Sequence, residues 1–124
     1  MSDGPLVLCA DDDHDILALL AIRLERAGFR VEQATDGEHA LSLARKLRPD
    51  VLVLDVMMPR LSGTEVLVAL RGDETTAAIP VVLLSARAQE ADVERGLEAG
   101  ADAYLAKPFQ APELVEVVTR LAGG

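Results

Sequence analysis

Residues 51–55, VLVLD, form a continuous apolar run that ends in an aspartate. A run of this kind, with Pro49 before it and the loop VMMPRLS after it, is typical of a strand buried on both faces of a parallel sheet. A carboxylate that directly ends a buried run needs a partner, because an isolated charge is costly to remove from water. The stretch therefore predicts the class of fold and also marks Asp55 as a candidate for chemistry.

Strand and helix patterns alternate on both sides of this run. We expect the other strands at Leu6–Ala10, Arg30–Ala34, Pro80–Ser85 and Ala103–Ala106. We expect helices from the polar Asp11–Asp15 up to Gly28, from Asp36-Gly37 up to Pro49, and over Gly63–Arg71, Gln89–Ala99 and Pro112–Ala122. Short connections between alternating strands and helices imply a parallel sheet covered on both faces. The predicted fold class is α/β, a doubly wound, five-stranded parallel sheet.

Apolar residues at helical spacing indicate which side of each helix faces the sheet. The residues expected inward are Ile16, Leu19, Leu20, Leu24, Ala40, Leu41, Ala44, Leu47, Val66, Leu67, Leu70, Leu114, Val117, Val118 and Leu121. The helix over 89–99 differs, because only Val93 and Leu97 serve as large apolar anchors and Gly96 lies in its interior. A weakly anchored helix is suited to conformational change.

Length and composition indicate one compact domain. The chain has 124 residues, half of them hydrophobic, which is too short for two ordinary domains, so we expect a single domain over 1–124 with its core at about 5–122. The ending Gly123-Gly124 fits either the start of a linker or a frayed terminus. With 12 basic and 21 acidic residues the net charge is −9, which argues against direct binding of nucleic acid.

Neither a signal peptide nor a membrane span is indicated. The first residues, MSDGPLVLCADDD, lack a charged start and a long apolar stretch, and no apolar run reaches the length of a membrane span. The single cysteine, Cys9, cannot form an internal disulfide and fits a small core residue. We therefore expect a cytoplasmic protein that does not associate with a membrane.

Chemically useful side chains gather where the predicted strands end. Asp11 and Asp12 follow the first strand, Asp55 ends the third, Ser85 ends the fourth and Lys107 follows the fifth. Open α/β sheets place their sites at this edge, beside the point where strand order reverses. If the strand order is 2-1-3-4-5, the first and third strands are neighbours and the three carboxylates converge.

Converging carboxylates predict a metal ion. Two carboxylates 4 to 5 Å apart repel by roughly 3 to 4 kcal/mol at an effective dielectric near 20, so three of them need a cation. Oxygen ligands on short loops suit a hard ion, and a site that also retains water and a phosphate oxygen favours Mg²⁺. Taken singly, Asp11, Asp12 and Ser85 fit helix caps and Lys107 fits a surface lysine, whereas Asp55 ends a buried run and is harder to explain as a plain cap. Their joint placement favours function.

The same residues carry a resemblance to a known family. Asp11-Asp12 after LVLCA, VLVLDVMMPRLSG around Asp55, VVLLSA through Ser85, and GADAYLAKPF through Lys107-Pro108 resemble the receiver domains of bacterial two-component signalling. The resemblance covers residues 5–122, and four motifs in this order are highly specific. It implies the flavodoxin-like (βα)5 fold with strand order 2-1-3-4-5.

The resemblance implies a role for each site residue. Asp55 is expected to be the phosphoacceptor, and Asp12 the main acidic metal ligand. Asp11 is expected to act through a metal-bound water and the backbone carbonyl of Met57 to complete the protein ligands of Mg²⁺, with Mn²⁺ as an alternative ion. Lys107 is expected to neutralise the phosphoryl oxygens and Ser85 to bond one of them. The Lys107-Pro108 bond is expected to be cis.

The resemblance also implies partners and a switch. The phosphoryl donor is expected to be a phosphohistidine on a sensor histidine kinase or a histidine phosphotransfer protein, and the listener a downstream partner or a missing output domain. When Ser85 is drawn to the phosphoryl group, the ring of Tyr104 is expected to move and to alter the surface of the fourth helix, fifth strand and fifth helix. The alternative is that Tyr104 is simply a half-buried strand aromatic.

Four residues bear on finer properties of the family. Ala103 and Val117 replace an acid and an arginine that are common in receivers attached to winged-helix domains, so we expect a monomer or a weak phosphorylation-dependent dimer. Met57 and Arg87 resemble positions that tune the lifetime of the acyl phosphate.

Other interpretations remain open. A hydrolase of the haloacid dehalogenase type also uses an aspartate nucleophile and Mg²⁺, but it needs a second acid where this chain has Met57. A degenerate receiver that binds partners without phosphorylation usually lacks an acid or the lysine, all of which are present here. The sequence fits a stand-alone receiver and also a part of a larger regulator or hybrid kinase.

Overall fold

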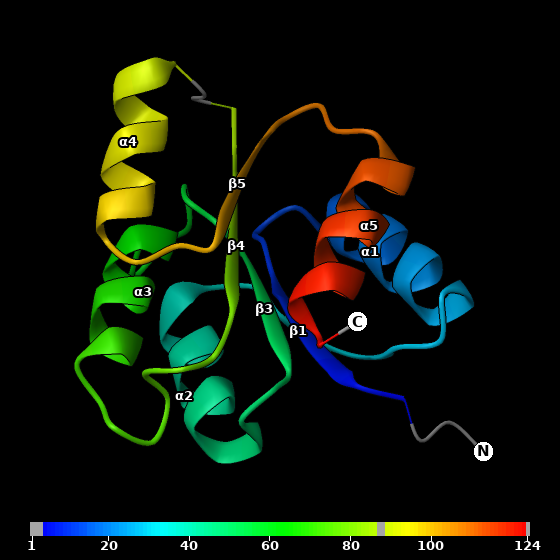
Figure 1. Ribbon diagram of the computed structural model, residues 1–124, viewed down its shortest axis with the longest axis horizontal. Coiled ribbons are helices and arrows are strands. Elements are labelled where there is room, and N and C mark those ends of the chain that lie inside the picture. Colours follow the sequence, from blue (N-terminus) through cyan, green and yellow to red (C-terminus); the bar gives the residue numbers. More distant parts are fainter. Residues whose placement is uncertain (1–3, 87–88, 124) are drawn as a thin grey trace.

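The computed structural model describes residues 4–86 and 89–123, which form an alternating series of strands and helices (Figure 1). In chain order the elements are β1 (Leu6–Ala10), α1 (His14–Arg26), β2 (Arg30–Ala34), α2 (Gly37–Leu47), β3 (Val51–Asp55), α3 (Gly63–Arg71), β4 (Val81–Ser85), α4 (Glu90–Glu98), β5 (Ala103–Ala106) and α5 (Ala111–Leu121). Within the described residues, no helix is long and apolar enough to cross a membrane.

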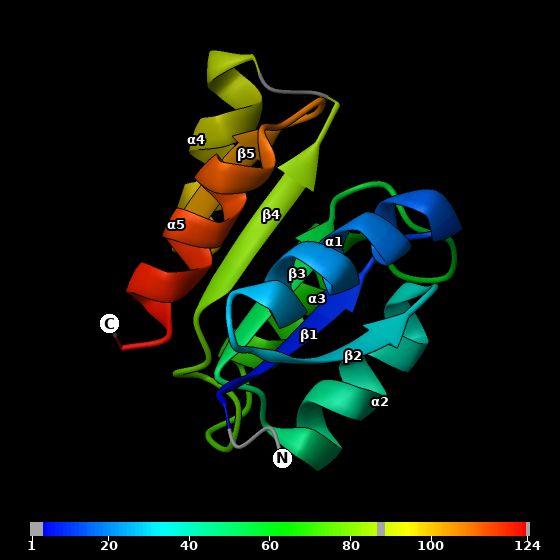
Figure 2. The same cartoon turned by 90° about the vertical axis from the view of Figure 1, so that its right-hand side faces the viewer.

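The five strands make one parallel sheet in the order β2-β1-β3-β4-β5, as expected. The arrows of the strands point to the same edge of the sheet in Figure 2. In the register, Ala10 lies beside Leu54 and Asp55 beside Leu84, so β1, β3 and β4 end almost level with one another. The residues that follow these strands therefore share one edge.

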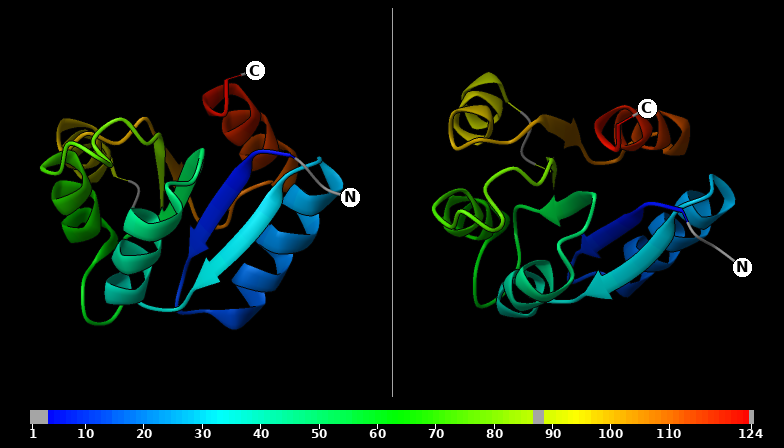
Figure 3. Two further views of the ribbon diagram at one scale, coloured as in Figure 1. Left: turned by 90° about the horizontal axis from the view of Figure 1, so that it is seen from below. Right: turned by 60° about the horizontal axis from the view of Figure 1, so that its bottom comes forward.

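Helices cover both faces of the sheet. Helices α1 and α5 lie on one side and α2, α3 and α4 on the other (Figures 1 and 3). Successive strand residues point to opposite faces, so Val7 packs with the α1–α5 side and Leu8 with the α2–α4 side. Strands β3 and β4 are buried along their whole length, which explains their nearly continuous apolar sequence.

Polar side chains begin the first three helices. The side chain of Asp13 accepts hydrogen bonds from the backbone N–H groups of Asp15 and Ile16 at the start of α1. The side chain of Asp36 accepts one from the backbone N–H of His39 at the start of α2. At α3, Ser62 and Glu65 form a reciprocal capping box, in which each side chain accepts the backbone N–H of the other. These caps fix where each helix leaves the edge at which the strands end.

Arg71 joins the connections at the opposite edge of the sheet. Its guanidinium donates to the carbonyl oxygens of Ala77 at 3.0 Å, Ile79 at 2.7 Å and Gly100 at 2.8 and 3.1 Å. It also contacts the carboxylate of Asp102 at 3.1 Å. One side chain from α3 therefore ties the α3–β4 connection to the α4–β5 connection.

The structure differs from the sequence expectation in the bounds of three elements and in two side chains. Strand β4 begins at Val81 rather than Pro80, α4 is one residue shorter at each end, and α5 begins and ends one residue earlier. Leu19 and Leu97, expected to face the sheet, are 40% and 45% exposed. Leu17 in α1 and Gly96 in α4 are buried in their place, so the anchoring predicted for Leu97 was wrong, whereas Val93 is half-buried.

Candidate active site

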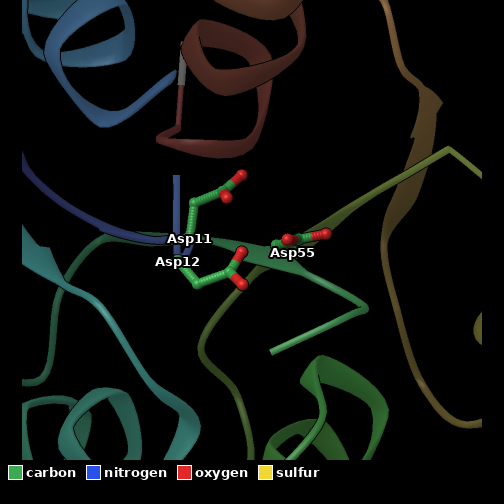
Figure 4. Close-up of side chains that lie close together, drawn as sticks. All are labelled: Asp11, Asp12 and Asp55. Carbon is green, nitrogen blue, oxygen red and sulfur yellow. The ribbon is translucent and has the colours of Figure 1, made fainter. Parts of the chain in front are cut away.

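Three aspartates converge where β1 and β3 end. Asp11 and Asp12 follow β1 directly, and Asp55 is the last residue of β3. Each offers a carboxylate oxygen, and these oxygens lie within 4.8 Å of one another. Figure 4 shows the carboxylate of Asp12 extending toward Asp55, with that of Asp11 turned to one side. The predicted convergence of these three residues is confirmed.

Asp11 and Asp12 are adjacent in sequence but have different surroundings. Asp11 is fully buried, accepts the backbone N–H of Asp13 at 2.9 Å and pairs with the Lys107 ammonium at 2.9 Å. Asp12 is exposed to solvent. Because both oxygens of Asp11 already have a partner, the carboxylate of Asp12 is the one better placed to exchange water for a cation.

Lys107 places a positive charge among the carboxylates. It follows β5, its backbone N–H donates to the carbonyl of Ser85, and its Nζ lies 3.3 Å from Asp55 in addition to its contact with Asp11. Burial alone would lower the pKa of Lys107, but the hydrogen bond to Asp11 and the charge of Asp55 outweigh it, so the pKa is raised. The Lys107-Pro108 bond is cis, as expected.

The carboxyl group of Asp55 is nearly buried, and its environment disfavours the charged form. Burial raises the pKa of Asp55 to about 6, with a further contribution from the negative charge of Asp11. Lys107 and the backbone N–H of Met57, which donates to Asp55 at 3.3 Å, act in the opposite direction. A divalent cation beside the three carboxylates would favour ionised Asp55. The donor set therefore fits Mg²⁺.

The segment after Asp55 packs closely against it. A Cβ added to Gly63 would lie 2.3 Å from the backbone oxygen of Asp55, and the Gly63 N–H donates to the carbonyl of Val56. The side chain of Met57 is 53% exposed. Sequence reasoning did not single out Gly63, because its importance depends on a close approach of two backbone segments that no local pattern reveals.

Ser85 and Tyr104 lie on neighbouring strands. Ser85 is buried at the end of β4, and Tyr104 is half-buried on β5 opposite Leu83. The ring edge of Tyr104 faces Gly96 of α4. Their proposed roles in signalling stay predictions, as does the influence of Met57 on phosphoryl lifetime, and Arg87 lies outside the described residues.

A family model described as the response regulator receiver domain matches residues 7–119. The transcriptional regulatory protein PrrA of Mycobacterium tuberculosis is 50% identical over 118 residues, which cover 95% of this chain and 50% of that protein. The chain thus spans about half the length of the curated relatives it matches.

Solved structures agree with this match. The receiver domain of a Francisella response regulator is 39% identical with a TM-score of 0.92, covering 96% of this chain and 97% of that one. The receiver domain of a sensor histidine kinase from Pseudomonas aeruginosa, with a magnesium ion coordinated in its active-site cleft, is 31% identical with a TM-score of 0.89, covering 98% and 99%. This chain therefore belongs to the response regulator receiver domains, the family whose role in two-component signalling is to accept a phosphoryl group.

Proposed function

We propose that Asp55 of this chain accepts a phosphoryl group and that the chain works as a phosphorylation-controlled switch rather than as a conventional enzyme. The observation that carries the proposal is the meeting of the Asp11, Asp12 and Asp55 carboxylates with the Lys107 ammonium at one edge of the sheet. We take residues 1–124 as one receiver domain with its core at about 5–122.

The metal is proposed to be Mg²⁺, with Mn²⁺ as an alternative. Asp12, Asp55 and the backbone carbonyl of Met57 are the proposed direct ligands, and Asp11 acts through a water molecule. The contacts of Asp11 support this division, because its oxygens already meet Lys107 and the N–H of Asp13. The Pseudomonas receiver structure, with a magnesium ion coordinated in its active-site cleft, supports the choice of metal. When bound, Mg²⁺ supplies positive charge that the phosphoryl oxygens need during transfer.

The proposed reaction is an in-line transfer from a phosphohistidine. An oxygen of Asp55 attacks phosphorus while the P–N bond breaks, the bonding electron pair leaves on the imidazole nitrogen, and the products are an acyl phosphate on Asp55 and histidine. Lys107 balances the charge of the phosphoryl oxygens, because its Nζ already lies 3.3 Å from the Asp55 carboxylate. The hydroxyl of Ser85, which is buried at the end of β4, donates a hydrogen bond to a phosphoryl oxygen.

The proposed output is a change in the surface formed by α4, β5 and α5. Movement of the Tyr104 ring follows the recruitment of Ser85, and α4 responds because only part of its length is anchored. The proposed donor is a sensor histidine kinase or a histidine phosphotransfer protein. The signal is proposed to pass to a partner protein or an output domain. The chain is proposed to work in the cytoplasm as a monomer or a weak dimer, without binding nucleic acid itself.

Intact mass measurement tests the central proposal. The chain is incubated with Mg²⁺ and acetyl phosphate, and we expect wild type to gain one phosphoryl mass and Asp55→Ala to gain none. Asp50→Asn is a matched control, because Asp50 lies at the other end of the sheet, where it accepts the N–H of Leu6. Equal gain by wild type and Asp55→Ala, or no gain by either, would contradict the proposal.

A further inference from the structure

Gly96 is the buried residue of α4 and lies against the ring of Tyr104. A Cβ added at this position would lie 2.8 Å from Cδ2 and 2.9 Å from Cε2 of Tyr104, and 3.1 Å from Cδ1 of Leu83. Contacts below 3.0 Å are not tolerated without movement, so a side chain at 96 and the present position of the Tyr104 ring exclude each other. Glycine is required at position 96 because there is no room for a side chain, and not because the backbone has a positive φ.

The contact matters more because α4 has few other attachments. Its N-cap, Gln89, forms no side-chain cap hydrogen bond, and Leu97 is 45% exposed. Glycine in the middle of a helix is unfavourable compared with alanine. The stability of α4 on the sheet therefore depends on the close fit of Gly96 against Tyr104 and Leu83.

Free space lies beside the same ring. A pocket of about 200 Å³ lies between α4 and the segment that follows Asp55. Its lining includes Val56, Met57, Thr64, Arg95, Gly96 and Tyr104. The ring of Tyr104 thus fits closely against α4 and also lines a pocket that reaches the residues next to the phosphoacceptor, so there is space into which a displaced ring can move.

We propose that Gly96 is the positioning residue of the switch: by lacking a side chain it lets the Tyr104 ring rest against α4, so that ring movement and helix movement are coupled. The proposal rests on the proposed function, because the coupling carries a signal only if Asp55 is phosphorylated. A larger residue at 96 displaces the ring in advance, and the displaced ring no longer responds fully to phosphorylation.

The chain contains a single tyrosine and no tryptophan, so its tyrosine fluorescence reports on Tyr104 alone. The variants are Gly96→Ala and the control Gly72→Ala, at whose position an added Cβ meets only Val68 and Ala69 carbonyl oxygens at 3.6 and 3.8 Å. Fluorescence is recorded before and after acetyl phosphate and Mg²⁺, with the extent of phosphorylation read by intact mass.

We expect Gly96→Ala to differ from wild type before phosphorylation and to lose at least half of the phosphorylation-dependent change, while Gly72→Ala matches wild type in both. A Gly96→Ala protein with the wild-type spectrum and the full change would overturn the inference. So would a wild-type protein that is phosphorylated without any change in tyrosine emission. Failure of the proposed function is distinct, because wild type would then gain no phosphoryl mass.

Thermal unfolding of a double variant separates positioning from helix stability. Introduced into the wild-type protein, Gly96→Ala should lower Tm. Introduced into the Tyr104→Ala variant, it should leave Tm unchanged or raise it, because no ring then opposes the methyl group and alanine favours a helix. An equal decrease of Tm in both backgrounds would show that Tyr104 is not the partner of Gly96 and would overturn the inference.

Discussion

The charges at the site are only partly balanced by the protein. Asp11, Asp12 and Asp55 bring three carboxylates together, and the Lys107 ammonium lies 2.9 Å from Asp11 and 3.3 Å from Asp55. Ionised, this group of four side chains carries an excess of negative charge. A divalent cation would neutralise that excess and favour ionised Asp55, the form of the carboxyl group that acts as a nucleophile.

Lys107→Met should weaken the fold in the absence of Mg²⁺. The buried carboxylate of Asp11 then loses its ammonium partner, and we expect the free energy of unfolding to fall by about 1 to 3 kcal/mol. Mg²⁺ should restore more stability to this variant than to wild type. Urea unfolding in EDTA and in Mg²⁺ measures both effects, with the exposed Lys46→Met as the control. Identical unfolding of wild type and Lys107→Met in EDTA would rule out this role for the lysine.

Cys9 offers a test of burial through its pKa. Burial raises the pKa of the Cys9 thiol to about 12, so the folded protein holds it neutral at pH 8 while the unfolded chain ionises near the ordinary value. This preference stabilises the fold below pH 9 and is lost as the pH rises toward 12. We expect a disulfide reagent at pH 8 to label Cys9 only at the rate of unfolding. Rapid labelling in the absence of denaturant would contradict the burial of Cys9.

At the residue scale, the sequence predicts what depends on chain order. Asp11, Asp12, Asp55 and Lys107 were found because parallel strands bring their carboxyl ends to one edge. The contact of Gly63 with the Asp55 backbone and the contacts of the Arg71 guanidinium with two chain connections were not found, because they depend on how loops fold back in space and leave no periodic pattern in the sequence.

At the element scale, the helices show where pattern reading succeeds and fails. The inward face of α3 is correct, since Val66, Leu67 and Leu70 are all buried. In α4 the largest apolar residue, Leu97, misled the prediction, because the sheet-facing position is occupied by a glycine that no hydrophobicity pattern marks. The phase of a helix is set by what it packs against, and here that is the ring of Tyr104.

Arg71→Lys should destabilise the junction between α3, β4 and β5. Lysine cannot reproduce the planar guanidinium that donates to the carbonyls of Ala77, Ile79 and Gly100. Some of these carbonyl oxygens therefore lose their hydrogen-bond donor. We expect a loss of about 2 to 4 kcal/mol in urea unfolding, with the exposed Arg120→Lys within about 0.5 kcal/mol of wild type. Since the junction lies opposite the site, folded Arg71→Lys should still gain a phosphoryl mass. A stability equal to that of wild type would show that water replaces the fork.

For the whole molecule, the acidic site should make stability depend on Mg²⁺. A ligand at ten times its Kd stabilises the folded protein by about 1.4 kcal/mol, which in a domain of this size raises Tm by a few degrees. We expect this increase with MgCl₂ and not with NaCl of equal ionic strength, and Asp12→Ala should lose most of it. A similar increase with NaCl would point to screening of the net charge of −9 instead of a specific site.

The sheet also divides the molecule into two separately packed halves. Neighbouring strand residues such as Val7 and Leu8 belong to different clusters, one beneath α1 and α5 and the other beneath α2, α3 and α4. Substitutions on opposite sides share few partners, so their energetic effects should combine additively. Each side can therefore accumulate substitutions in its own packing without forcing the other side to repack.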